Sequence, residues 1–512
     1  MKQHTTWVTT AVIVLLAGAL TLWGCRKEPT TWAVDVHLPV VDMLLDWADV
    51  LPADAAIEMP PGEVAHLVWQ GEVARLDVSG LGQIPDTTVA NDLTPDFVGG
   101  PIAVPPGSTL LDEFEDISFD VDGPEFRRLT LDSGLLAWTV ESTTDGFVRL
   151  QYDFPGVVKD GVPVRLDIVL PPATEVGGLA SASGVIDIAE ASVDFTGISG
   201  TSRNKIASHL IIGTPEDISD TAQVFGDDSI RVAMTFSGMK VRDIEGYFGS
   251  FDVDVNEGLP LFDPSTFPSG LIGLSPLRAD LMLVNNMAAD LRLNLTSLSL
   301  GGTSIDHPSI GQDQYLARAD WSAGTPPVAD VWSMDLLSTT PAFFDVLAAL
   351  PDSLRASGEL EINPLGDVSG GNDYFHKDYP PLLKLDLDVP LNVALTDLVF
   401  RDTLRIAPTE VPDFDGRLHI EVRNGFPVQM SLAGAWQPSG SSFAATLEPR
   451  AGGAGEAPVT TISVPISSEE LAAGGDIQFE AGLATAGYKN FTGHERIRIR
   501  VRIEGTHNVV IE

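Results

Sequence analysis

A row of arginines near the end of the chain is the first candidate for binding chemistry. The segment RIRIRVRIE alternates basic and apolar residues with a period of two. In a β-strand, this period places the basic side chains on one face. They are Arg496, Arg498, Arg500 and Arg502. Guanidinium groups in such a row could hold a lipid phosphate or an acidic glycan through bidentate contacts. The alternative is a strand paired beside an acidic one, such as the strand with Asp386 and Asp388 in LLKLDLDVPL.

A second candidate is a set of oxygen ligands spaced roughly like a calcium loop in FDVDVNEGLPLFD. The set is Asp252, Asp254, Asn256 and Asp263. The glycine lies one position later than in an EF-hand loop, and the last ligand is aspartate rather than glutamate. A strand with its polar face outward explains the first two aspartates equally well. The segment EDISFDVDGPE, residues 115–125, is a weaker version of the same pattern.

The segment NDYFHKDYPP, residues 372–381, gathers two tyrosines, a phenylalanine and a histidine just before a predicted strand. Exposed rings of this kind could stack on sugars, and the alternative is that they pack onto the neighbouring sheet. The common signatures of catalysis are missing: there is no G-x-S-x-G, H-E-x-x-H, Walker loop or G-x-G-x-x-G after a strand. We therefore assign no catalytic residue, no metal and no cofactor, and we expect a protein that is not an enzyme.

Cys25 is the only cysteine in 512 residues. A lone cysteine forms neither an intramolecular disulfide nor a cysteine-based zinc site. The preceding residues begin with a lysine, continue with an apolar run from Val8 to Trp23 and end at Gly24, which is the layout of a secretory signal. The run is short for a membrane span and is followed directly by charged residues.

The sequence Leu22-Trp23-Gly24-Cys25 resembles the lipobox of bacterial lipoproteins. Trp23 departs from the small residue usual at that position. The resemblance implies that residues 1–24 are a signal peptide, that Cys25 is lipidated, and that residues 25–34 tether the fold to a membrane. Arg26 after the cysteine, rather than Asp, implies by the same resemblance the outer membrane, with the face left open.

The composition narrows the choice of partners. The formal net charge is −42, from 72 acidic and 30 basic residues. Such a charge repels nucleic acid and anionic membrane surfaces, so nucleic acid is not expected as a partner. A high-salt habitat and a GC-rich genome with an acidic protein explain this charge equally well. A partner from the envelope, such as a protein, a lipid or a glycan, stays open, and so does the oligomeric state.

Alternation with a period of two dominates the chain, as in WAVDVHLPV, GEVARLDVSG and VPVRLDIVL. Turn residues separate these segments, which predicts strands with one buried face. Only three short helices are expected, near residue 41, from Thr340 and from Ser467. We predict an all-β fold of tandem antiparallel β-sandwich modules, divided into regions 35–175, 176–310 and 311–512.

Internal similarity supports repeated modules. Residues 278–298 align with residues 416–436, matching Asn286 with Asn424, and residues 131–154 and 358–367 are looser copies. The spacing is uneven, so the repeat is not a solenoid. The Asn-containing corners in ELEINPLGD and HIEVRNGFPVQMSL are similar to late-embryogenesis-abundant type 2 β-sandwiches. The wider arrangement resembles outer-membrane lipoproteins of the Bacteroidota, a family without known chemistry.

These observations predict a lipid-anchored envelope lipoprotein with a binding or scaffolding role. One alternative is a carrier of lipids or amphiphiles, which requires inward-facing leucines around a void rather than a filled core. Another is a glycan-binding adhesin or glycan-active enzyme, which requires exposed aromatic rings beside converging carboxylates.

Overall fold

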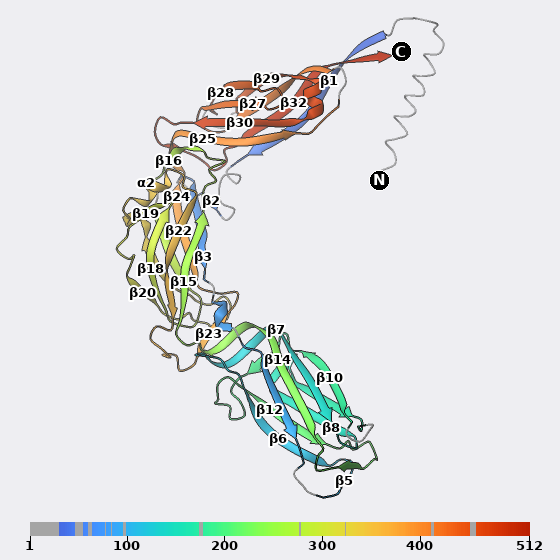
Figure 1. The fold of residues 1–512 in the computed structure, drawn as a ribbon. Helices are drawn as coiled ribbons and strands as arrows, with labels where there is room; N and C mark the ends of the chain where they lie inside the picture. The colour runs from blue at the N-terminus through green and yellow to red at the C-terminus, as the bar shows by residue number, and fades with distance from the viewer. Residues whose placement is uncertain are drawn as a thin grey trace.

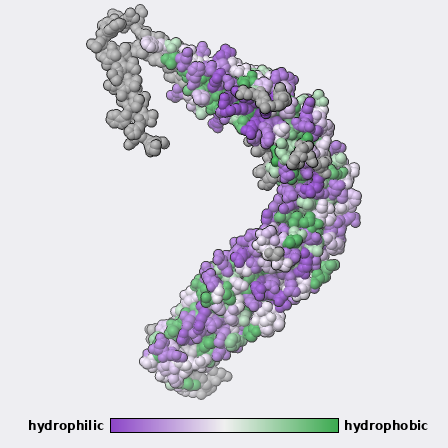
Figure 2. All heavy atoms as spheres, turned by 180° about the vertical axis from the view of Figure 1, so that it is seen from behind, coloured by the Kyte–Doolittle hydropathy of each residue, from purple (hydrophilic) through white to green (hydrophobic). Residues whose placement is uncertain are grey.

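The computed structural model describes residues 30–46, 55–59, 64–76, 78–82, 84–95, 99–173, 178–275, 278–322, 324–410, 414–450 and 457–511. Three β-rich modules follow one another along a curved arm (Figure 1). The prediction of an all-β fold with a few short helices is confirmed. Hydrophilic residues cover most of the face in Figure 2, where hydrophobic residues form small separate patches, as expected for an acidic surface.

The terminal module contains the first and the last described strands. One of its sheets has the order β1-β32-β26-β29, and the other has the order β16-β25-β30-β27-β28, with β31 on β25. Their inward side chains form a single hydrophobic core. The strands are β1 (Thr30–Leu45), β16 (Ser269–Gly273), β25 (Asn392–Ile406), β26 (Phe414–Asn424), β27 (Met430–Trp436), β28 (Ser441–Leu447), β29 (Val459–Ser467), β30 (Gly475–Leu483), β31 (Lys489–Asn490) and β32 (Ile497–Ile511).

The middle module has a sheet of order β2-β3-β24-β17-β21 and a sheet of order β15-β22-β18-β19, with β20 also on β18. The strands are β2 (Ala56–Glu58), β3 (His66–Arg75), β15 (Phe251–Pro260), β17 (Arg278–Asn285), β18 (Leu291–Leu300), β19 (Thr303–Ile305), β20 (Asp313–Leu316), β21 (Asp330–Asp335), β22 (Ser353–Ile362) and β24 (Leu382–Pro390).

The distal module lies at the far end of the arm (Figure 1). Its main path is β23-β14-β7-β11-β8-β12-β6, with β10, β4 and β9 attached to β7, β14 and β8; β5 and β13 form a separate pair. The strands are β4 (Thr87–Leu93), β5 (Ile102–Val104), β6 (Thr109–Ser118), β7 (Glu125–Ser142), β8 (Val148–Lys159), β9 (Val162–Leu170), β10 (Ala180–Asp187), β11 (Ser192–Asp194), β12 (Lys205–Gly213), β13 (Ala222–Val224), β14 (Ile230–Tyr247) and β23 (Asp373–His376).

The chain visits the three modules in nested order. It supplies β1 to the terminal module, β3 to the middle one and β4 to the distal one, then builds most of the distal, middle and terminal modules in turn. The exceptions are β16 of the terminal sheet and β23 of the distal sheet, which both come from the stretch that builds the middle module. Strand pairs therefore cross the boundaries expected from the sequence: β7 pairs with β14, and β1 pairs with β32. The modules are not the consecutive segments 35–175, 176–310 and 311–512, because alternation identifies strands but not their partners.

The three modules repeat one strand order. The first sheet runs β1-β32-β26-β29, β3-β24-β17-β21 and β4-β14-β7-β10, and the second runs β25-β30-β27-β28, β15-β22-β18-β19 and β6-β12-β8-β9. The distal module differs in that β11 pairs with both β7 and β8 and so joins its two layers. The repeat lies in the topology of the modules, which explains why the sequence shows only weak and uneven similarity.

A buried polar residue marks the same corner in each module. Asn285, Asn424 and Ser142 each end a strand, and the next strand begins six residues later. In each case the side-chain oxygen accepts from the backbone N–H two residues on, at 2.9, 2.9 and 3.2 Å. The residue equivalent to Asn424 is therefore Asn285, whereas the sequence alignment matched it with Asn286.

The described part of the segment near residue 41 is not the expected helix, because β1 continues as a strand through Leu45. Residues 47–51 of that segment lie outside the described residues. Val36, Leu38, Val41 and Met43 pack against the terminal core, so pairing with β32 overrides the local helical pattern. The other two helices are present as α2 (Phe343–Leu347) and α3 (Ser468–Ala473), the latter with a capping box on Ser467. Two short 3-10 turns, η2 (Ser79–Gly82) and η3 (Leu336–Ser338), complete the helical structure described.

The hydrophobic cores are distributed unequally. The middle and distal modules share one continuous cluster of buried residues, whereas the terminal module has its own. Leu67 and Leu274, both half-buried, pack against both clusters. Among the described residues, no helix is both long enough and apolar enough to span a membrane.

Candidate functional site

The predicted arginine strip lies on β32 and faces acidic partners on its neighbours. Arg498 donates to both carboxylate oxygens of Asp42 on β1, at 2.7 and 2.6 Å, and Arg500 donates to the same carboxylate at 3.2 Å. Arg502 contacts Glu421 of β26 at 3.1 Å. Arg496 lies just before the strand and is exposed. Three of the four arginines thus contribute to cross-strand ion pairs.

Hydrogen bonds from Arg498 and Arg500 to Asp42 lower the pKa of that carboxyl from 3.8 to about 2. The acidic neighbour proposed from the sequence was a different one. Asp386 and Asp388 lie on β24 of the middle module, where Asp386 pairs with Arg278 at 2.7 Å and Asp388 with His66 at 2.8 Å. The strip therefore offers little free guanidinium for an anionic ligand.

The predicted calcium ligands do not converge. Asp252, Asp254 and Asn256 lie on the exposed face of β15, which is a continuous strand paired with β22. Alternate residues of a strand are about 7 Å apart, so these side chains form a row rather than a cage. The side chain of Asp263 is used in a turn, where it accepts from the backbone and hydroxyl of Ser265. Within the described ranges, no group of three or more His, Cys, Asp or Glu residues is placed to hold a metal.

The aromatic segment 372–381 packs on itself and on Trp321. The Trp321 ring contacts Tyr374 edge-on, with ring centroids 4.7 Å apart, and also contacts His376 and Tyr379. Its indole N–H donates to the Asn286 carbonyl at 3.0 Å. Burial raises the pKa of Tyr374 to about 12. All four rings are half-buried, as the packing alternative expected, and they contact one another mostly edge to face.

Cys25 and the rest of the predicted signal and tether up to residue 29 lie outside the described residues. The first described strand, β1, begins at Thr30, which is inside the segment 25–34 assigned to the tether.

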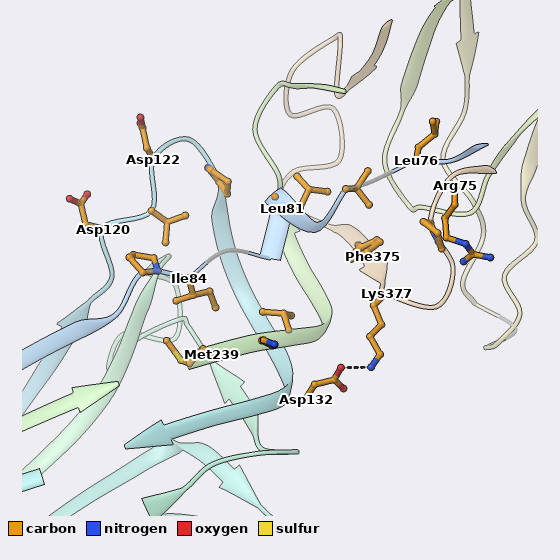
Figure 3. Close-up of a pocket in the computed structure, with 18 residues that line it drawn as sticks. Arg75, Leu76, Leu81, Ile84, Asp120, Asp122, Asp132, Met239, Phe375 and Lys377 are labelled. Atoms are coloured by element: carbon orange, nitrogen blue, oxygen red, sulfur yellow. Dashed lines mark hydrogen bonds and ion pairs between the residues drawn. The ribbon is translucent and has the colours of Figure 1, made fainter. Parts of the chain in front are cut away.

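A cleft of about 1020 Å³ lies between the middle and distal modules (Figure 3). Its apolar surface comes from residues such as Leu81, Met239 and Phe375, and charged side chains lie around it. Lys377 forms an ion pair with Asp132, and Arg75 binds Glu72 through two hydrogen bonds. The charges at this cleft are of both signs and partly satisfy one another, so it does not select one class of ligand.

A second cavity lies where the terminal and middle modules meet, and it differs in chemistry. It measures about 210 Å³, and its described lining residues are all apolar except Asp46. Leucine, valine, isoleucine and phenylalanine side chains from both modules form most of its wall. Those contributed by the strands are Leu67, Trp69, Ile272, Leu387, Val389, Val393, Leu395, Leu398, Phe400, Met430, Ala481, Leu483 and Ile497.

One strand path builds much of this wall. β24 of the middle module ends at Pro390, and β25 of the terminal module begins at Asn392, so the chain passes directly from one sandwich to the other. Alternate residues from Leu387 to Leu395 line the cavity on both sides of the junction. The sequence did contain this signal, because an alternating apolar run from Leu383 to Leu395 is longer than one typical strand.

Trp69 adds a polar group to this apolar wall. Its side chain is buried and lines the cavity, and its indole N–H has no acceptor among the described residues. A buried N–H without an acceptor is costly, so an oxygen acceptor within reach of this group would be favourable. The arrangement is suited to holding an apolar molecule, and we identify no set of groups in it that could perform acid-base or nucleophilic chemistry.

No family model and no curated protein matches the chain. Among solved structures, the chain aligns with the crystal structure of a protein from Parabacteroides distasonis that has been assigned as secreted. The alignment covers 93% of this chain and 99% of that one, at 9% sequence identity and a TM-score of 0.22. With so low a TM-score, this similarity supports no conclusion about function.

Proposed function

We propose that this protein is a lipid-anchored lipoprotein of the cell envelope, at the outer membrane, and that it binds an amphiphile in the cavity between its terminal and middle modules. The observation that carries this proposal is the apolar lining of a cavity of about 210 Å³. The carrier alternative expected a void in place of a filled core, whereas this cavity lies between two modules, and its apolar wall supports the proposal. The lipid anchor itself rests on the lipobox around Cys25.

The energetics of such a cavity favour an occupant. An apolar cavity costs roughly 24 cal/mol per Å³, so an empty one of about 210 Å³ would cost on the order of 5 kcal/mol. Water does not fill it well, because a buried water needs two to four polar partners. An engineered apolar cavity of about 150 Å³ binds benzene, so this larger one has room for a short hydrocarbon segment.

The indole N–H of Trp69 narrows the ligand class further. A pure hydrocarbon would leave this donor without an acceptor, whereas a hydroxyl, ester or amide oxygen could accept from it. The ligand class that matches the wall is therefore an amphiphile with an alkyl or aryl segment and a nearby oxygen acceptor.

Probe binding tests the cavity directly. We expect N-phenyl-1-naphthylamine, a neutral apolar fluorophore, to bind the full chain, and 1-octanol to displace it. Ala481→Met adds volume inside the cavity and should reduce the affinity at least about tenfold. Ala433→Met is the matched control, because Ala433 is exposed on the neighbouring strand β27. Equal affinity in the wild type and in Ala481→Met would refute the assignment of the site.

Two further measurements test the cellular side of the proposal. Radiolabelled palmitate should enter the wild type and not Cys25→Ser, and equal labelling would exclude the lipoprotein assignment. Native mass spectrometry of the protein purified from its own envelope should show a bound mass that is absent from Ala481→Met. A reproducible apo mass would argue against a resident amphiphile and for scaffolding.

Scaffolding is the second candidate, favoured by the nested chain path. β1 and β32 both belong to the terminal module, so a lipid on Cys25 would anchor that end and hold the distal module away from the membrane (Figure 1). Photo-crosslinkers at exposed positions of the distal module should then capture an envelope protein in intact cells. Val185 of β10 is one such position, at 62% exposure. Capture only from the terminal module would contradict this role.

A further inference from the structure

The end of the arm that receives the tether is a two-stranded ribbon. β26 pairs with β32 only from His507 backward, so the last residues of β32 are paired with β1 alone among the described strands. Thr30–Ala33 and Asn508–Ile511 form this ribbon, which extends beyond the sandwich (Figure 1). Four residue pairs correspond to an extension of roughly 10–13 Å.

One face of β1 remains apolar along this extension. Trp32, Val34, Val36 and Leu38 are alternate residues of the strand and so share a face. Val36 and Leu38 pack against the terminal core, whereas Trp32 is 62% exposed and Val34 is 45% exposed. The same apolar face thus begins in the core and continues past its edge, where the folding of the module does not use it.

The chain itself indicates what covers this face. Cys25 precedes Thr30 by five residues, a distance of at most about 18 Å when fully extended. A lipidated Cys25 would therefore hold the tip of the ribbon close to the bilayer. We propose that Trp32 and Val34 insert into the interfacial region of the lipid bilayer beside the lipid anchor. This inference rests on the lipid anchoring proposed above.

The chemistry of the two residues fits a lipid surface. Tryptophan is enriched at membrane interfaces, where its ring is buried among acyl chains and its N–H stays near polar headgroups. The rest of the protein is strongly acidic, with a formal net charge of −42, and is repelled by anionic headgroups. An uncharged apolar contact at the tip can rest on the bilayer while the acidic modules stand away from it.

Depth-dependent quenching in vesicles tests this contact. The full lipoprotein is reconstituted into phosphatidylcholine vesicles with and without 6,7-dibromo acyl chains, which quench nearby tryptophans. We expect part of the tryptophan emission of the wild type to be quenched and Trp32→Phe to lose that part. Trp332→Phe is the control, because Trp332 lies on β21 of the middle module, and it should keep the quenched part.

The outcomes separate the docking from the anchor. Flotation of the protein with the vesicles reports the lipid anchor and should be unchanged in Trp32→Phe. Flotation of the wild type without any bromolipid quenching, or equal quenching in Trp32→Phe, overturns the docking while leaving the anchor intact. Failure of the wild type to float overturns both. As a second variant, Val34→Asp should also reduce the quenched part by about half or more, because a charge on this face opposes insertion.

Discussion

The two junctions between modules are built differently. Where the middle and distal modules meet, one hydrophobic core runs through both, and β23 pairs with β14 of the distal sheet. Where the terminal and middle modules meet, two separate cores face each other across an apolar cavity. The modules share one strand order, so the junctions rather than the modules distinguish the parts of this arm.

A buried carboxylate strengthens the junction between the middle and distal modules. Asp373 accepts from Asn363 at 2.8 Å, from Arg318 at 3.1 Å and from the backbone N–H of Phe248 at 3.2 Å. Phe248 follows β14 of the distal module, whereas Asn363 follows β22 of the middle module. One side chain thus ties the ends of strands from both modules. The terminal junction has an apolar cavity of about 210 Å³ and a backbone hydrogen bond from Ile272 of β16 to the Ala348 carbonyl, at 2.9 Å.

The largest effect is expected from Asp373→Ala. Removing the buried carboxylate takes one acceptor each from Arg318, Asn363 and the Phe248 N–H, so unfolding of the middle and distal modules should become easier by about 3–5 kcal/mol. Calorimetry and urea unfolding measure this change. Asp378→Ala, at an exposed aspartate of the same segment, is the control and should change stability little. A wild-type-like Asp373→Ala would mean that the network does not hold this junction.

The next largest effect should show that the two hydrophobic cores unfold in separate transitions. Leu283→Ala in the middle core and Leu418→Ala in the terminal core each remove a buried side chain, at a cost of about 3 kcal/mol. We expect the first to lower the transition shared by the middle and distal modules, and the second to lower only the transition of the terminal module. Calorimetry of both variants checks this. If each substitution shifts every transition, the arm unfolds as one unit and the contrast between junctions is wrong.

A smaller effect, on ligand affinity, should show whether the indole N–H of Trp69 binds the ligand. Trp69→Phe keeps an aromatic ring but removes the buried N–H, so affinity for 1-octanol should fall by about fivefold to tenfold. Affinity for n-octane, which has no acceptor, should not fall. Displacement of N-phenyl-1-naphthylamine measures both. Equal losses for the two ligands would indicate that the ring shape, and not the N–H, matters.

The sequence predicts the strands of this fold better than their partners. Period-two alternation identifies β3, β8 and β9, because a half-buried strand imposes it directly. The pairing of β1 with β32 depends on residues at opposite ends of the chain, and no local pattern encodes it. The same limit explains the Arg498 pair: an acidic partner strand was expected, but the structure assigns this role to Asp42.

The candidate site was less accessible to sequence analysis than the fold. The cavity wall combines residues as distant as Leu67 and Leu483, which meet only because the nested chain path brings two modules together. Each of these side chains resembles an ordinary core residue in its own strand. The cavity lies between two sandwiches, so its volume depends on how the modules meet and cannot be predicted from the residues of either module alone.

The smallest expected effect is the loss of the Asp42 ion pair at low pH, and it should destabilise the terminal module alone. Hydrogen bonds from Arg498 and Arg500 hold the pKa of Asp42 at about 2 in the folded protein, below its ordinary 3.8. A depressed pKa means that the carboxylate stabilises the fold above about pH 4, and that this contribution is lost as the pH falls toward about 2. Because the pair is exposed, the effect should be small and weakened by salt.

Asp42→Asn therefore tests the strip without disturbing the core. The melting temperature of the terminal module should be lower in the variant than in the wild type at neutral pH, and the difference should vanish near pH 2. Asp35→Asn is the control, because Asp35 faces Thr506 across the same strand pair. If the difference in melting temperature persists at pH 2, Asp42 stabilises the module through the packing of its side chain and not through its charge. A shift in the transition of the middle and distal modules would mean that the cavity transmits changes from the terminal module to its neighbour.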